Sequence, residues 1–182
     1  MMAPRTNPFR RLLAYGIDIS LLYAGLLAVQ FGFHFLTRWA VPDWLVAGGD
    51  YVLVYGWIVL TISLPMWLYF ILFESGPRGA TPGKALLGLR VTDLAGRRIA
   101  LSRASLRTAC KLAFFEIGHL SFLFPTPLAD EAVPSFRVGF VIVPALMGLY
   151  FVLTFVTRRG QSVHDLVART LVVRRPAEAA GS

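Results

Sequence analysis

An aspartate inside a long apolar segment is the first place in this sequence where chemistry can be expected. Asp18 interrupts residues 12–36, which are otherwise apolar and long enough to cross a bilayer, a distance that takes about 20 helical residues. A carboxylate there costs roughly 2.5–3.5 kcal/mol on insertion scales, so it needs a partner or a bound ion. Arg11 precedes it by seven residues, which is about 10 Å along a helix and nearly the same face. We therefore expect Arg11 and Asp18 to share one polar pocket.

Other ionisable residues border the apolar segments and complete the set of candidate site residues. Besides Arg11 and Asp18, the main candidates for an ion-binding, ligand-binding or structural polar network are Arg107, His164 and Asp165, and the secondary candidates are Lys84, Glu116 and His119. Glu116 and His119 are i, i+3 neighbours on a predicted helix. This spacing allows either acid/base chemistry or a hydrogen bond to another helix, and we favour the hydrogen bond.

Motifs for enzymatic chemistry are incomplete. Residues 79–84 resemble a phosphate-binding loop, but Arg78 stands where that loop needs its first glycine and Ala85 where it needs a hydroxyl. The three histidines lie in different segments without the spacing of a helical metal site. The single cysteine, Cys110, excludes an internal disulfide and any metal site built from several cysteines. We therefore expect no enzymatic activity, no metal site and no cofactor.

The composition is that of a small membrane protein with several spans. Hydrophobic residues make up 56% of the 182 residues, only 15% are charged, and the mean hydropathy is +0.63, whereas about a quarter of a soluble domain is charged. Four apolar segments predict membrane helices over residues 12–36, 51–73, 106–128 and 136–157. Pro65 should kink the second, because proline lacks a backbone donor. The third is short, and it either spans the bilayer or is re-entrant.

The basic residues indicate how the chain is oriented. Four spans place both termini on the same side of the membrane as the large loop, residues 74–105. Of the 18 lysines and arginines, 16 fall on that side, and only Arg38 and Arg137 fall opposite. The positive-inside rule then makes this side cytoplasmic, in the inner (plasma) membrane. The net charge of +8 reflects this topology and an attraction to anionic lipid headgroups, and no nucleic-acid motif is present, so we expect no nucleic-acid partner.

The polar segments predict a small amount of β structure. Residues 87–93 and 97–101 alternate about a Gly-containing turn, which predicts a hairpin on the membrane surface. Ser162 is a suitable cap for a short helix, residues 170–173 favour a strand, and residues 176–182 have the composition of a disordered tail. The expected fold is an all-α integral membrane protein with about four transmembrane helices, a small cytoplasmic β-hairpin and a C-terminal strand.

Three blocks of sequence, taken in order, resemble the RDD family of membrane proteins. The blocks are Arg11 with Ala14-Tyr15-Gly16-Ile17-Asp18, then residues 79–93 (GATPGKALLGLRVTD), then Gln161-Ser162-Val163-His164-Asp165 followed by Thr170-Leu171-Val172-Val173. The resemblance implies one membrane domain over about residues 8–175. The arginine and two aspartates of the family name fall on Arg11, Asp18 and Asp165, with Asp93 the less favoured second aspartate. Arg169 departs from the family pattern, which implies a glycine before the final strand.

The resemblance also implies a class of function. Members of the family are suspected of transporting unidentified ligands, and some are assigned to cation/proton exchange. One hypothesis is therefore an exchanger in which Asp18 binds a cation or proton, Arg11 biases its ionisation and Asp165 shares the pocket, although the same groups could simply tie the first helix to the carboxyl-terminal segment. The alternative is a membrane-anchored module whose basic loop binds anionic lipid or a partner protein. Because four spans enclose little volume, transport would require a homo-oligomer or a membrane-protein partner.

Overall fold

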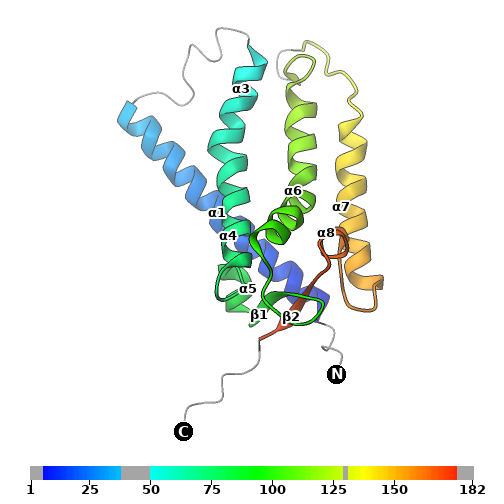
Figure 1. Ribbon diagram of the computed structural model, residues 1–182. Helices are drawn as coiled ribbons and strands as arrows, with labels where there is room; N and C mark the ends of the chain where they lie inside the picture. Colours follow the sequence, from blue (N-terminus) through cyan, green and yellow to red (C-terminus); the bar gives the residue numbers. More distant parts are fainter. Residues whose placement is uncertain (1–5, 38–49, 129–130, 176–182) are drawn as a thin grey trace. The chain divides into compact units, whose positions relative to one another are not determined.

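The computed structural model describes residues 6–37, 50–128 and 131–175, and these residues are mostly helical (Figure 1). The elements are α1 (Pro8–Thr37), α3 (Tyr51–Ile58), the π-helical turn η1 (Val59–Ser63), α4 (Leu64–Ser75), α5 (Pro82–Leu86), β1 (Leu89–Asp93), α6 (Leu101–Leu123), α7 (Gly139–Val156), α8 (Val163–Val167) and β2 (Thr170–Arg174). The predicted disordered tail, residues 176–182, lies outside the described residues.

The chain divides into two compact units, and each is considered by itself. The first unit comprises Met1–Ile19, Trp67–Lys111 and Gly148–Ser182, and the second comprises Ser20–Met66 and Leu112–Met147. The first unit therefore contains the β-strands, the short helices and the ends of longer helices, whereas the second is built from the apolar remainders of those helices.

Three helical segments of the described chain are long and apolar enough to cross a membrane. They are Pro8–Gly32 of α1, Tyr51–Ser75, which runs through α3, η1 and α4, and Gly139–Val156, which is α7. Large apolar side chains on these segments point outward: Val29 is 70% exposed and Phe31 is 67% exposed. Such a surface is unfavourable in water and suited to lipid. These helices coincide with three of the predicted spans, and the mostly helical structure agrees with the predicted all-α class.

The remaining predicted span, residues 106–128, coincides with α6 but differs from it in extent. α6 is a continuous helix of 23 residues that begins at Leu101 and ends at Leu123, so it starts about one turn earlier than expected. Its amino-terminal half carries Arg107 and Lys111, which makes α6 less apolar than the other three segments. The early start follows from a favourable helix-forming sequence before Leu106 that contains no glycine or proline.

The predicted cytoplasmic hairpin is wrong in its second strand. β1 pairs antiparallel with β2 over the whole of both strands, from Leu89 opposite Arg174 to Asp93 opposite Thr170. The turn after β1 does form, since the N–H of Asp93 donates to the carbonyl of Arg97 at 2.9 Å, but the chain enters α6 at Leu101 before a strand can be built. β2 therefore pairs with β1 in the position predicted for residues 97–101. Its apolar side chains supply the cross-strand contacts along the whole of β1.

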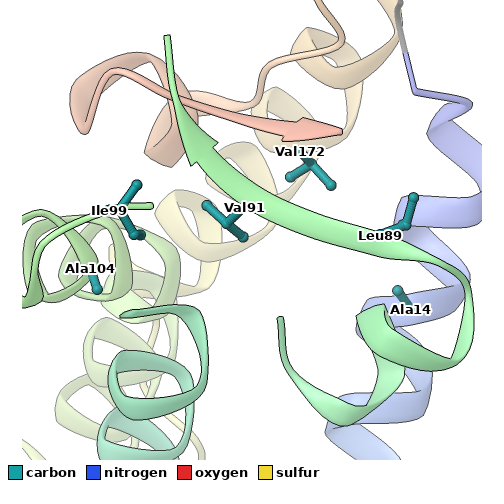
Figure 2. Close-up of a cluster of buried hydrophobic side chains, with 6 residues drawn as sticks. All are labelled: Ala14, Leu89, Val91, Ile99, Ala104 and Val172. Atoms are coloured by element: carbon teal, nitrogen blue, oxygen red, sulfur yellow. The ribbon is translucent and has the colours of Figure 1, made fainter. Parts of the chain in front are cut away.

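The apolar core of the first unit lies against this two-stranded sheet. Figure 2 shows Leu89 and Val91 of β1 beside Val172 of β2, with Ala14 of α1 next to Leu89. The core also includes Ile99 and Ala104, and its six members are at most 4% exposed. The sheet therefore packs on the start of α1 and on the start of α6, which brings the polar residues of both helices into one region.

The predicted kink at Pro65 takes the form of a π-helical turn. The N–H of Leu64 donates to the carbonyl of Val59, five residues back, instead of the usual four. Proline at 65 explains the widened turn, because its missing N–H leaves the carbonyl of Thr61 without the regular helical partner. Turns of this kind are frequent at functional sites, and this one lies in the second unit.

Candidate functional site

Asp18 is completely buried in the first unit, with donors around both carboxylate oxygens. The hydroxyl of Tyr69 and the backbone N–H of Gly83 each donate to Oδ1 at 2.7 Å, and the hydroxyl of Thr81 donates to Oδ2 at 2.5 Å. The ammonium of Lys84 lies further away, 3.8 Å from Oδ2. Neutral donors from α4 and from the start of α5 therefore make the close contacts, and one lysine supplies the opposite charge.

The segment that resembles a phosphate loop, residues 79–84, is a cradle for this carboxylate. Pro82 opens α5, which places the N–H of Gly83 in the unbonded first turn of the helix, where it is free to donate to Asp18. A Cβ on Gly83 would lie 2.8 Å from Oδ1 of Asp18 and closer still to the backbone carbonyl of Ala14. Only glycine fits at position 83. The glycine-containing pattern of residues 79–84, which resembles a phosphate-binding loop, is therefore explained by the carboxylate of Asp18 that it contacts.

Glu74 is a second fully buried carboxylate, and it contacts three cations. Its Oε1 accepts from Lys111 at 2.5 Å and from Lys84 at 3.1 Å, and its Oε2 accepts from Nε of Arg107 at 2.7 Å. The ring of Phe70 lies under both ammonium groups, 4.0 Å from Lys111 and 5.6 Å from Lys84, which adds a cation–π contribution.

Asp165, at the start of α8, is the third fully buried carboxylate. It forms ion pairs with Arg11 of α1 and Arg107 of α6. The backbone N–H of Ser162 donates to it at 3.0 Å, as half of the capping box that closes the start of α8, which confirms the helix cap predicted at Ser162. The hydroxyl of Thr170 accepts from Arg107 at 2.6 Å and lies 3.3 Å from Asp165.

The charged neighbours of Asp165 fix its protonation and that of His164. Burial alone would raise the pKa of Asp165, but the guanidinium groups of Arg107 and Arg11 outweigh it and hold the pKa well below 3.8. Burial lowers the pKa of His164 well below 6.5, although its Nε2 lies only 3.6 Å from the carboxylate of Asp165. Asp165 is therefore ionised and His164 neutral at neutral pH.

These contacts form one continuous network within the first unit. Its ion pairs run from Asp18 to Lys84, Glu74, Arg107, Asp165 and Arg11, with Lys111 as a branch at Glu74. Three carboxylates therefore face four basic side chains. Arg11 and Asp18 belong to the same network as expected, although through intervening residues. The structure thus brings together Arg11, Asp18, Lys84, Arg107, His164 and Asp165.

Several members of the network were not predicted from the sequence. They are Tyr69, Glu74, Thr81, Lys111 and Thr170. Glu74 has the clearest signal in hindsight, because it is the first acid after an apolar segment that begins at Tyr51. Hydroxyl residues carry no comparable signal, since their role depends on which segment folds next to them.

Glu116 and His119 lie in the second unit and form a separate cluster with Tyr55. The hydroxyl of Tyr55 in α3 donates to Oε2 of Glu116 in α6 at 3.2 Å, which confirms the predicted helix-to-helix hydrogen bond. Nδ1 of His119 is 3.7 Å from the same oxygen, too far for a hydrogen bond, and it is buried with no hydrogen-bond partner among the described residues.

Asp93 and Arg169 have local roles. Asp93 accepts from the backbone N–H groups of Ala95 and Arg97, and the donation from Arg97 is the main reason that its pKa lies below the usual value. Arg169 has a φ of 51°, the left-handed region that favours glycine. The backbone before β2 is therefore the one that the glycine of the family pattern would adopt, with arginine in its place.

Apolar outward-facing helices and charged side chains buried in their ends define an integral membrane protein. More particularly, the chain belongs to the RDD family, whose sequence model matches residues 5–169. Arg11, Asp18 and Asp165 all fall inside the matched range. Neither the curated proteins nor the solved structures contain a match to this chain.

Proposed function

We propose that this RDD-family membrane protein exchanges a monovalent cation for a proton, with Asp18 at the cation site. The observation that carries the proposal is the burial of Asp18 among oxygen atoms, since the hydroxyl groups of Tyr69 and Thr81 both contact its carboxylate. Carboxylate and hydroxyl oxygens are the ligands that hard cations prefer. Rotation of the two hydroxyl hydrogens would convert both groups from donors into ligands with no change of the backbone.

Lys84 would compete with such a cation. Its ammonium lies 3.8 Å from Asp18, 3.3 Å from the hydroxyl of Thr81 and 3.1 Å from Glu74, so it already supplies positive charge beside the proposed site. Two cations cannot share this buried space without strong repulsion. Binding at Asp18 is therefore expected to displace the ammonium of Lys84 toward Glu74, which links the cation site to the rest of the network.

The proposal includes an orientation in the membrane. α6 is about 34 Å long at 1.5 Å per residue, enough to serve as a fourth span with its basic end at the surface. With four spans, the distribution of lysine and arginine places both termini in the cytoplasm, at the plasma membrane. A bundle of four helices leaves little room for a path, so a second copy or another membrane protein would complete it.

Cation-dependent proton flux in proteoliposomes tests the proposed function. A pH-sensitive dye inside the vesicles should report flux for the wild type and none for Asp18→Asn. Asp50→Asn is a matched control, because Asp50 is an exposed cap of α3 and asparagine caps a helix equally well. Flux in both the wild type and the control, and none in Asp18→Asn, supports the proposal. A wild type that shows no flux above empty vesicles with any common monovalent cation overturns it.

A second candidate function is binding of anionic lipid by the basic cytoplasmic loop. Arg97 is exposed over 80% of its side chain, and two leucines of the same loop, Leu86 and Leu94, are 74% and 48% exposed. Basic residues beside exposed apolar ones suit a membrane surface. If this is the function, Arg97→Gln with Arg98→Gln should abolish the stabilisation of the protein by anionic lipid in nanodiscs, whereas Asp18→Asn should preserve it. Equal loss in both variants would count against lipid binding by the loop.

A further inference from the structure

In the cluster of Tyr55, Glu116 and His119, the carboxylate accepts a hydrogen bond from a neutral group, whereas the carboxylates of the buried network pair with lysine or arginine. Glu116 accepts one hydrogen bond, from the neutral hydroxyl of Tyr55, and both this bond and the closest approach of His119 are to Oε2. Within the described residues, Oε1 of Glu116 has no hydrogen-bond donor. In contrast, Asp165 in the first unit pairs with two arginines and accepts a backbone N–H.

No lysine or arginine of the described chain pairs with Glu116, and three charged residues of the second unit have contacts elsewhere. Arg137 pairs with Glu131, and Asp50 caps α3. The part of α7 in this unit, residues 139–147, contains no ionisable side chain. Among the described residues, the ionisable groups that contact Glu116 are Tyr55 from α3 and His119 from its own helix.

We propose that Glu116 is a proton-binding site, with His119 as the group that exchanges the proton with it. The proposal rests on the proposed function, for which it supplies the proton site, separate from the cation site at Asp18. An ionisable residue inside a membrane-spanning helix is a candidate for proton transfer, and the contacts of Glu116 are with a neutral hydroxyl and an imidazole. Glu116 lies seven residues, about 10 Å, before the end of α6 at Leu123, which places it inside the proposed span.

The unpartnered Nδ1 of His119 is the second observation that supports this assignment. A proton on Oε2 of Glu116 would move to Nδ1 once their 3.7 Å separation shortens to a hydrogen-bond distance. The carboxylic acid then becomes a carboxylate and the neutral imidazole becomes an imidazolium, so the cluster keeps its total charge. Release of the proton from the imidazolium to water restores neutral His119 and leaves Glu116 ionised, with Tyr55 still donating to it.

Infrared difference spectroscopy of the full-length protein in nanodiscs tests the proton site without any need for transport. Acid-minus-alkaline difference spectra of the wild type should contain the carbonyl band of a protonated carboxylic acid. Glu116→Gln should remove this band, and Tyr55→Phe should shift its frequency, because the acid loses one hydrogen bond. Glu131→Gln is the matched control in the same unit. Glu131 accepts from the N–H of Ser135 and pairs with Arg137, and its pKa of about 2 keeps it ionised throughout.

The outcomes separate this site from the proposed function. A band that persists unchanged in Glu116→Gln, or a wild type without a titrating band, overturns the site. If Glu116→Gln does not fold, a frequency shift in Tyr55→Phe still assigns the band to this cluster, and an unshifted band overturns the assignment. Wild-type exchange that continues undiminished in Glu116→Gln proteoliposomes also overturns the site but leaves exchange standing. A Glu116 band in a protein that moves no cation supports the site and overturns exchange.

Discussion

Arg11 and Asp165 are 154 residues apart in the sequence and form a buried ion pair that joins the start of α1 to the start of α8. The pair closes the first unit, because Asp165 also binds Arg107 and caps its own helix. A buried charge is costly unless its partner is present. The packing of the start of α1 and that of the start of α8 should therefore each require the charged residue of the other helix.

Loss of one partner of this pair should destabilise the protein strongly. Asp165→Asn removes the carboxylate that pairs with Arg11 and leaves Arg107 with Glu74 alone, so we expect the free energy of unfolding in detergent to fall by about 3–5 kcal/mol. Arg11→Gln should also destabilise, and the double variant should lose less than the sum of the two single losses. The neighbouring Arg10 is exposed, so Arg10→Gln serves as the control. Equal stability of Arg11→Gln and Arg10→Gln would contradict a stabilising role for the pair.

The partners of Arg11 show what the sequence could and could not predict. Hydropathy predicted the helices, Asp18 stood out as an acid in an apolar segment, and the resemblance to the family identified Arg11 and Asp165. Glu74 is visible in the sequence as the first acid after an apolar segment, but the sequence does not show that three cations would meet at it. The partner of β1 was missed for a related reason: alternation indicates a strand but does not say which distant segment pairs with it.

Acid should destabilise the protein in two separate pH ranges. The folded-state pKa of His164 lies well below 6.5, so the unfolded chain takes up a proton first and stability falls as the pH drops below 6.5. The folded-state pKa of Asp165 lies well below 3.8, so its contribution is complete above 3.8 and is lost only below that value. In His164→Gln the unfolding temperature should therefore fall less steeply between pH 6.5 and pH 3.8 than in the wild type. The fall below pH 3.8, which reflects Asp165, should remain.

Unfolding temperatures of the wild type and His164→Gln, measured across this pH range, test whether His164 causes the loss of stability below pH 6.5. His119→Gln is a useful comparison because it also removes an imidazole, from the second unit. An unchanged slope between pH 6.5 and 3.8 in His164→Gln would show that another group controls stability there.

Replacement of Arg169 by glycine should stabilise the protein. Arg169 is exposed and has a φ of 51°, a conformation that costs an ordinary residue about 1–2 kcal/mol, whereas glycine adopts it freely. Because glycine also gains entropy in the unfolded chain, we expect a net increase of up to about 1 kcal/mol in the free energy of unfolding. Arg169→Ala removes the same side chain but retains the strained conformation, so it should show no such gain. A gain of equal size in both variants would instead point to the arginine charge.

Gly83→Ala should disrupt the cradle around Asp18. The added methyl group would lie 2.8 Å from Oδ1 of Asp18 and would collide with the backbone carbonyl of Ala14, which cannot rotate away as a flexible side chain could. We expect a loss of about 1–3 kcal/mol in the free energy of unfolding, the usual range for overpacking a dense site. The hydrogen bond from the N–H of Gly83 to Asp18 would lengthen at the same time.

Gly16→Ala is the matched control for this substitution. Gly16 lies in the same unit, on α1, and a Cβ there would meet no atom within 4 Å. Alanine is the better helix former by about 1 kcal/mol, so this variant should unfold at the same temperature as the wild type or higher. Because both variants add one methyl group to a glycine, a difference between them measures the space beside Asp18. If both unfold at the wild-type temperature, α5 can move away from α1 at little cost, and the cradle is looser than the distances to Asp18 indicate.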